Sequence, residues 1–339
     1  MTKVVNFKQA LEESGHRKRH LLLGNGFSMA CNKEVFAYSQ LLKNADFDGL
    51  SPNAHKCFEV LETQDFETVM SALRTTTKLV KLYGSDKSVT KTMQEDATAL
   101  REVLVQAISS SHPARPTDVS KDSYAACRSF MDKFDRIYSL NYDLLLYWAV
   151  MQDDSAVRKG GRNDGFSSDS DTNPWVVWDQ LNHNHNQNLF YLHGALHIYD
   201  AGHEVQKCTW SRTKIALIDQ IREAMKEDKF PIFVAEGESE AKLARIMHHG
   251  YLHRSLRSFS NITGCLFIYG HSLAESDEHI LNRIEQGKVK DVWVSIYGDP
   301  TTQANLRVIE RAQRMERARG RTAPLKVHFF SAETAKVWG

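Results

Sequence analysis

The stretch YSLNYDLLLYW at residues 138–148 reads as a buried strand that runs directly into a helix. Two polar side chains, Asn141 and Asp143, interrupt its apolar residues at the junction. An amide that is buried without hydrogen-bond partners costs roughly 2–7 kcal/mol. We therefore expect these side chains either to cap the helix that follows, as Asn and Asp often do, or to bind a ligand at the end of the strand.

Short apolar runs that end in polar or glycine-rich turns recur along the chain. They predict strands over 19–27, 135–143, 188–194, 229–239, 264–272, 291–300 and 325–333. Amphipathic segments between the later runs predict helices over 213–228, 239–259, 276–287 and 302–319. Strands that alternate with helices are typical of an α/β fold in which helices cover both faces of a parallel sheet.

Two segments depart from this alternation. Residues 50–130 carry helical spacing and little strand character, which predicts a helical insertion between the first and second core strands. Residues 152–174 are rich in Gly, Ser and Asp, which predicts a flexible loop. We expect residues 1–339 to form a single α/β domain that contains both segments.

The composition narrows the class of protein. Apolar residues make up 42% of the 339 residues, and 43 basic against 42 acidic side chains give a net charge of +1. Such a balance lacks the basic field that nucleic-acid binding needs. The five cysteines include no CxxC pair, which argues against a disulfide framework and a cysteine-rich zinc module. The polar first residues and the lack of a long apolar run predict a soluble, cytoplasmic protein.

Ligands of parallel α/β sheets bind at the carboxyl ends of the strands. Gly24 and Gly26 follow the first predicted strand and precede a helix. Glycines allow a backbone to approach a pyrophosphate, although Met29 occupies the third glycine position of the dehydrogenase fingerprint. An ordinary tight turn is the alternative explanation.

Two further strand ends carry polar groups. His193 stands before Gly194, and a histidine at such a position can act as a general base or as a structural hydrogen-bond partner. Gly270 and Ser272 form a second small polar turn, which could equally be a helix cap.

Taken in order, the motifs Gly-x-Gly-x-Ser, Asn-x-Asp, His-Gly and Gly-x-Ser-Leu resemble the sirtuin (silent-information-regulator) family. The sirtuin pattern is Gly-Ala-Gly-x-Ser, Gln-Asn-Ile-Asp, His-Gly and Gly-Thr-Ser-Leu. The resemblance spans about 19–300 through these short motifs. The chain looks most like divergent bacterial sirtuin-like proteins, some of which destroy NAD during phage infection. It also resembles an uncharacterised bacterial family with the signatures GNGFS, NYD and LHGALH.

The resemblance implies a Rossmann-like, sirtuin-like sheet with NAD as the substrate. Asn141 would orient the nicotinamide ribose and water, Asp143 would hold the nicotinamide carboxamide, and His193 would be the base. The residues implied to cradle the pyrophosphate are Gly24, Asn25, Gly26 and Ser28. Those implied to contact the adenosine-side ribose and phosphate are Gly270, His271 and Ser272.

Departures from the family pattern narrow the activity. The paired zinc-binding cysteines are absent, and MACNKEVFAYSQLL at 29–42 replaces the Gly-Ile-Pro-Asp-Phe-Arg run. These departures weaken acyl removal and favour an NAD hydrolase, plausibly in antiphage defence. A non-catalytic sensor of NAD or ADP-ribose derivatives, and an NAD-dependent deacylase or ADP-ribosyltransferase, are the alternatives. The resemblance also implies a homo-oligomer and a possible defence-system partner protein.

Metal binding is not expected from the local sequence. His-rich runs occur at 182–188 and 248–253, and His249 and His253 are spaced to share one face of a helix. No third ligand follows either run at a metal-binding spacing. We therefore predict no metal.

Overall fold

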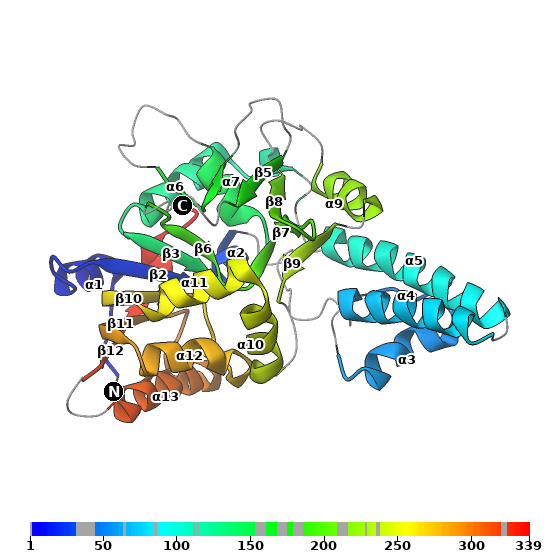
Figure 1. Cartoon of the computed structure of the whole chain (residues 1–339). Coiled ribbons are helices and arrows are strands. Elements are labelled where there is room, and N and C mark those ends of the chain that lie inside the picture. The colour runs from blue at the N-terminus through cyan, green and yellow to red at the C-terminus, as the bar shows by residue number, and fades with distance from the viewer. Residues whose placement is uncertain are drawn as a thin grey trace.

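The computed structural model describes residues 2–31, 45–63, 66–84, 87–110, 113, 115–152, 161–167, 175–178, 186–208, 216–227, 229–234, 238–319 and 324–339. These residues build one large parallel sheet covered by helices, a smaller antiparallel sheet beside it, and a helical arm that extends away from both (Figure 1).

The large sheet has seven strands in the order β1-β12-β11-β10-β2-β3-β6, and every pairing in it is parallel. Its strands are β1 (Val4–Val5), β2 (Arg19–Leu23), β3 (Arg136–Ser139), β6 (Leu189–Tyr191), β10 (Thr263–Tyr269), β11 (Lys288–Ile296) and β12 (Lys326–Ser331). The prediction of an α/β fold with a Rossmann-like parallel sheet is confirmed.

Helices cover both faces of this sheet. Phe7 of α1 (Phe7–Glu13) meets Phe267 of β10 edge to face, with the ring centroids 6.2 Å apart. The strand register places Ile137 of β3 on the same face as Phe267. Tyr138, the next residue, points to the other face, where its ring lies 5.1 Å from that of Phe259 in α11 (Gly250–Ser260). Burial on both faces explains why these strands read as continuous apolar runs.

The described part of the segment between β2 and β3 consists of helices and turns and contains no strand. Its elements are α2 (Gly26–Cys31), α3 (Pro52–Val60), α4 (Phe66–Leu82), α5 (Lys87–Ser110), η1 (Pro116–Asp118) and α6 (Lys121–Met131). Helices α3 to α5 form the arm in Figure 1. Helix α6 returns to the sheet, where Phe130 lies 5.3 Å from the Phe7 ring. The limits of the insertion as a separate unit stay a prediction.

The smaller sheet corrects one expectation. It has the order β4-β5-β8-β7-β9, and its pairings are antiparallel. Its strands are β4 (Phe166–Ser167), β5 (Trp175–Trp178), β7 (Gly194–Asp200), β8 (Val205–Cys208) and β9 (Phe230–Phe233). The run at 229–239, expected among the parallel strands, supplies β9 and pairs with β7 instead.

Gly194 is the residue that allows this second sheet to start. It follows His193 with φ +74, a conformation that favours glycine, and a Cβ there would lie 1.9 Å from the Ile232 carbonyl oxygen. The chain can therefore turn from the end of β6 into β7 while the backbone of β9 lies against it.

The predicted helices after residue 213 form with different limits. They are α9 (Leu217–Lys226), α10 (Ser239–His248), α11, η2 (Glu275–Asp277), α12 (Glu278–Glu285) and α13 (Gln303–Ala318), while α7 (Leu145–Met151) follows β3. One predicted helix over 239–259 becomes two, because His249 has extended backbone angles. None of the described helices is long and apolar enough to cross a membrane.

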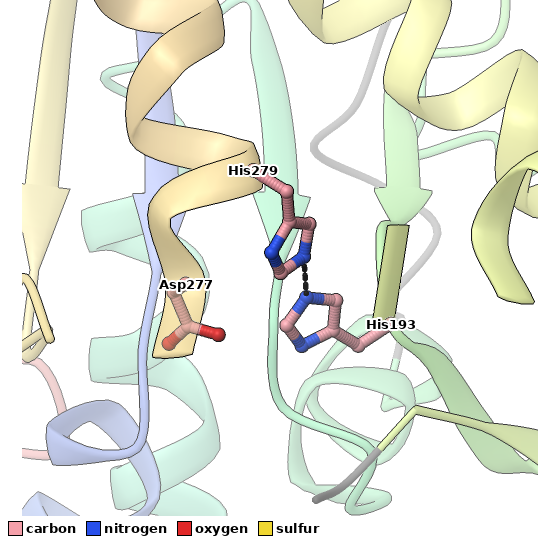
Figure 2. Close-up of side chains that lie close together, drawn as sticks. All are labelled: His193, Asp277 and His279. Atoms are coloured by element: carbon pink, nitrogen blue, oxygen red, sulfur yellow. Dashed lines mark hydrogen bonds between the residues drawn. The ribbon is translucent and has the colours of Figure 1, made fainter. Parts of the chain in front are cut away.

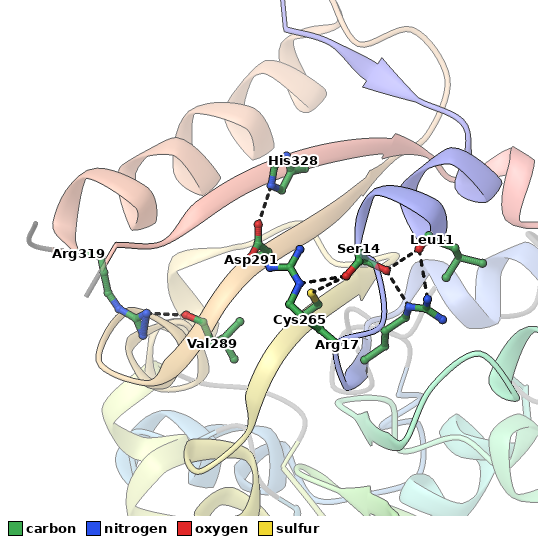
Figure 3. Close-up of polar contacts among 9 residues, drawn as sticks. Leu11, Ser14, Arg17, Cys265, Val289, Asp291, Arg319 and His328 are labelled. Atoms are coloured by element: carbon green, nitrogen blue, oxygen red, sulfur yellow. Dashed lines mark hydrogen bonds and ion pairs between the residues drawn. The ribbon is translucent and has the colours of Figure 1, made fainter. Parts of the chain in front are cut away.

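A polar cluster ties the connection from α1 to β2 onto the amino-terminal half of β11 (Figure 3). Arg17 forms an ion pair with Asp291, and His328 Nε2 lies 3.1 Å from Asp291 Oδ1. These groups lie toward the end of the sheet opposite the predicted ligand edge. We therefore assign them to the packing of the α1–β2 connection against β11 and not to the candidate site.

The contact of Gly194 with β9 can be tested by alanine substitution. Gly194→Ala should destabilise the protein by about 1–2 kcal/mol for the positive φ, plus about 1–3 kcal/mol for the clash with Ile232. Gly202→Ala is a matched control, because Gly202 has φ +83 and its Cβ would meet no described atom within 4 Å. Urea unfolding of both variants measures the difference; equal losses would show that the approach of β9 is not constrained by Gly194.

Candidate active site

The strand order creates a switch point between β2 and β10. From β2 the chain continues to β3 and β6 on one side, whereas from β10 it continues to β11 and β12 on the other. Crevices at such points are where open α/β sheets bind ligands. The four predicted motifs follow β10, β2, β3 and β6, which are four adjacent strands. The fold therefore gathers all of them at the carboxyl edge of the sheet.

The two glycine turns at this edge pack directly on each other. The N–H of Gly26 donates to the Gly270 carbonyl at 2.7 Å, and the N–H of Gly24 donates to the Tyr269 carbonyl at 2.9 Å. A Cβ on Gly26 would lie 2.6 Å from the Gly270 Cα. These glycines are thus needed for backbone packing, a reason that sequence alone did not reveal, and their amides already have partners.

Asn141, Asp143 and Ser28 form one buried hydrogen-bond network. Asn141 Nδ2 donates to the Gly24 carbonyl at 3.1 Å and to Ser28 Oγ at 2.9 Å. Ser28 Oγ donates to Asp143 Oδ2, and Asp143 Oδ1 accepts the N–H of Leu145 at 2.9 Å. Asp143 therefore accepts the first backbone N–H of α7 from the position before the N-cap residue, Leu144, and the network also joins the β2 and β3 turns.

Burial makes the Asp143 carboxyl a weaker acid than an ordinary aspartate. Loss of hydration raises its pKa to about 6, while the hydrogen bonds from Ser28 and Leu145 oppose the shift. A carboxylate that titrates near neutral pH at a strand end is a candidate functional group.

His193 lies in a second polar cluster (Figure 2). Its Nε2 is 3.0 Å from Nε2 of His279, at the start of α12. His279 Nδ1 lies 3.1 Å from Ser239 Oγ, which also accepts the backbone N–H of His279 at 2.7 Å. Sequence reasoning missed His279 and Ser239, because they lie outside the four motifs.

Both histidines are neutral near pH 7. Burial lowers the pKa of His193 to about 3 and that of His279 to about 4, although the charge of Asp277 raises both. Since neither ring carries a positive charge, one ring must donate and the other accept the hydrogen bond between them.

Asp277 is held between two donors. Lys242 Nζ donates to Oδ1 at 3.0 Å, and His271 Nε2 lies 3.0 Å from Oδ2. His271 Nδ1 accepts the N–H of Leu273 at 2.9 Å, so the proton of a neutral His271 is on Nε2. Both ring nitrogens of His271 are occupied, and a ligand contact through either would replace one of these bonds.

The remaining predicted residues differ in how far solvent reaches them. Ser272 is exposed, and Asn25, Gly26 and Gly270 are half-buried. Those that are buried are Gly24, Ser28, Asn141, Asp143, His193 and His271. The accessible part of the edge is therefore the pair of turns after β2 and β10.

One group of side chains in the described part of the chain could hold a metal ion. His193, Asp277 and His279 offer ligand atoms within 4.8 Å of one another, a donor set that zinc and iron accept. The Lys242 ammonium already neutralises Asp277. At an effective dielectric constant of about 20, unit charges 4 Å apart interact by about 4 kcal/mol. Repulsion from Lys242 would thus oppose the binding of a divalent cation at Asp277.

The expected absence of a metal stays a prediction. Among the described residues, His249 and His253 belong to no group of three ligands. His183 and His185 of the other His-rich run lie outside the described residues.

Comparison with known proteins shows the family. A family model described as a domain of unknown function (DUF4917) matches residues 21–338, and the chain belongs to that family. No curated protein matches it. Among solved structures, a mutant Sir2 with a p53 peptide and NAD is similar at 13% identity and a TM-score of 0.36, covering 92% of this chain and 98% of that chain.

The raised pKa of Asp143 predicts a pH-dependent effect of Asp143→Asn. In the unfolded chain the carboxyl ionises near its ordinary value, whereas in the folded protein it ionises near 6. Its contribution to stability is therefore present below the ordinary pKa and is lost as the pH rises through about 6. Between about pH 4.5 and 7.5, the variant should gain about 2 kcal/mol relative to the wild type. Urea unfolding at both pH values measures the gain, and a constant difference would contradict it.

Proposed function

We propose that this DUF4917 protein binds NAD and hydrolyses the bond between nicotinamide and ribose. The observation that carries the proposal is the strand order β10-β2-β3-β6, which brings four sirtuin-like motifs to one edge of the sheet at its switch point. The motifs are distant in sequence, so their adjacency is a property of the fold.

The pyrophosphate of NAD would lie over the packed turns after β2 and β10. Because the amides of Gly24 and Gly26 donate to carbonyls of the β10 segment, Asn25 and Ser272 are better placed to supply contacts. The glycines contribute by keeping both turns free of side chains where they meet.

Asp143 would act near the nicotinamide. A carboxylate has about four acceptor positions, and Ser28 and Leu145 use two. The others could accept the nicotinamide carboxamide, as the resemblance implies. Cleavage develops positive charge on the ribose, and a fixed negative charge nearby favours that transition state over bound NAD. The leaving group is neutral nicotinamide, so no strong acid is needed.

Asn141 and His193 would handle the oxygen nucleophile. Both hydrogens of Asn141 Nδ2 are used within the network, which leaves Oδ1 to accept a hydrogen bond from water or a ribose hydroxyl. His193 is neutral at pH 7 and so can accept a proton, and a positioned base typically contributes about 10²–10⁴-fold.

A second candidate function is the non-catalytic sensing of NAD or an ADP-ribose derivative. The observation that favours it is the pKa of His193 at about 3, since a base works best when its pKa is near the working pH. Acyl removal has less support, because the chain has no CxxC pair, whereas ADP-ribosyl transfer stays an alternative.

The biological setting is proposed from the resemblance alone. Antiphage defence, a homo-oligomer and a defence-system partner protein belong to this part of the proposal. The flexible loop predicted over residues 152–174 could also act as a lid, but 153–160 and 168–174 lie outside the described residues.

Replacement of His193 tests the catalytic proposal. His193→Gln should lower nicotinamide release by about 10²-fold or more. His20→Gln is the control, because His20 is buried and bonds the Thr263 carbonyl at the other end of the sheet. Wild-type turnover by His193→Gln would remove His193 as the base. NAD binding by calorimetry with no nicotinamide release from the wild type would favour the sensor.

Asn141→Ala should reduce kcat more than it raises KM, because the side chain orients groups in the transition state. It should also lower stability by about 1–3 kcal/mol, since Ser28 and the Gly24 carbonyl lose a donor. Steady-state kinetics and thermal unfolding separate the two effects. A higher KM with an unchanged kcat would make Asn141 a binding residue only.

A further inference from the structure

Three polar groups from distant parts of the chain form a continuous hydrogen-bonded row. Ser239 begins α10, His279 lies in the first turn of α12, and His193 is the second residue after β6. Their side chains are buried and are linked at 3.1 Å and 3.0 Å. Figure 2 shows the second ring nitrogen of His193, Nδ1, pointing away from His279. The two histidine rings are nearly parallel, with an interplanar angle of 21°.

The row allows two arrangements of protons. If the Ser239 hydroxyl donates to Nδ1 of His279, the His279 proton is on Nε2 and points at His193, which then carries its own proton on Nδ1. If Ser239 Oγ accepts from Nδ1 of His279, each ring carries its proton on the other nitrogen. His279 is then protonated on Nδ1 and His193 on Nε2, so Nδ1 of His193 keeps a free lone pair. Ser239 Oγ already accepts the backbone N–H of His279 at 2.7 Å, and a hydroxyl oxygen has two acceptor positions. The second arrangement fills both acceptor positions and leaves the Ser239 O–H to donate to a group other than His279.

We propose that His279 is the positioning residue for His193: it accepts the Nε2–H of His193 and so leaves Nδ1 of His193 as the proton acceptor. The inference rests on the proposed NAD hydrolysis. The O–H bond of a water or ribose hydroxyl breaks, its electron pair stays on oxygen, and its proton forms the Nδ1–H bond. The resulting imidazolium keeps its Nε2–H on the lone pair of His279, which Ser239 holds in place.

The charges around the row fit a proton acceptor. Asp277 offers a carboxylate oxygen within 4.8 Å of one ring nitrogen of each histidine, and its charge favours the imidazolium. Lys242 and His271, which bond to Asp277, oppose that effect. His279 therefore adds a directed hydrogen-bond acceptor to a site where Asp277 favours the imidazolium and its two partners oppose it.

A first experiment reads the proton positions without any turnover. The full chain, labelled with ¹⁵N-histidine, is studied by long-range ¹H–¹⁵N correlation near pH 7.5, and the His193 signals are assigned with His193→Gln. We expect the Nε2–H tautomer at His193 in the wild type and a mixture of tautomers in His279→Phe, whose ring accepts no conventional hydrogen bond. An Nδ1–H tautomer in the wild type would overturn the proposal.

A second experiment separates positioning from general structural damage. His279→Phe should lower kcat for nicotinamide release by about tenfold or more, within the range that a base contributes, and leave KM within about twofold. His279→Gln, whose amide oxygen can accept, should recover part of the loss. His20→Phe is the control for filling a buried histidine site with an apolar ring. Wild-type kcat in His279→Phe would overturn the inference.

The two experiments keep the inference and the proposed function apart. If the wild type releases no nicotinamide, NAD hydrolysis fails, and the tautomer of His193 still decides whether His279 positions it. Zinc titration of the wild type tests whether His193, Asp277 and His279 bind a metal ion instead. One equivalent bound by the wild type and lost in His279→Gln would make these residues a metal site and would overturn the role given to His279.

Discussion

The contact of two backbone turns at Gly26 and Gly270 is the constraint on which the candidate site depends. No side chain fits between them, since a Cβ on either residue would lie 2.6 Å from the other's backbone. This contact fixes the ends of β2 and β10 side by side at the switch point. Asn141 then joins the β3 turn to the same structure through the Gly24 carbonyl. These contacts hold the ends of β2, β3 and β10 together without a ligand.

His193 is held differently from the other candidate residues. Its carbonyl accepts the N–H of Val234, just beyond β9, at 2.8 Å, and its side chain meets His279 from α12. The Asn141–Asp143–Ser28 network and the His193–His279–Ser239 row therefore rest on separate parts of the fold. In both, the polar groups satisfy one another when buried, so each side chain has a structural role whether or not it has a chemical one.

The sequence predicted the parallel sheet well, because strands buried on both faces leave continuous apolar runs with polar residues at their ends. It placed Asn141, Asp143 and His193 at strand ends for the same reason. It could not place β9, whose partner is set by the positive φ of Gly194 and not by local spacing. It also missed the break at His249, since the amphipathic pattern continues through it. The contacts of His279 join residues that are far apart in the sequence, so no periodic pattern of residues predicts them.

His193 and Gly194 lie where the chain passes from one sheet to the other. His193 follows β6, the edge strand of the parallel sheet, and Gly194 begins β7 of the antiparallel sheet. This arrangement limits which parts of the protein can be exchanged. The arm of α3 to α5 contacts the antiparallel sheet, because the guanidinium groups of Arg74 and Arg101 lie 5.6 Å and 5.9 Å from the centre of the Phe230 ring in β9. An exchange of the arm would therefore remove contacts that β9 makes. A chimera that retained the parallel sheet and replaced the smaller one would keep the NAD-binding turns but lose the backbone partner that sets the orientation of its histidine.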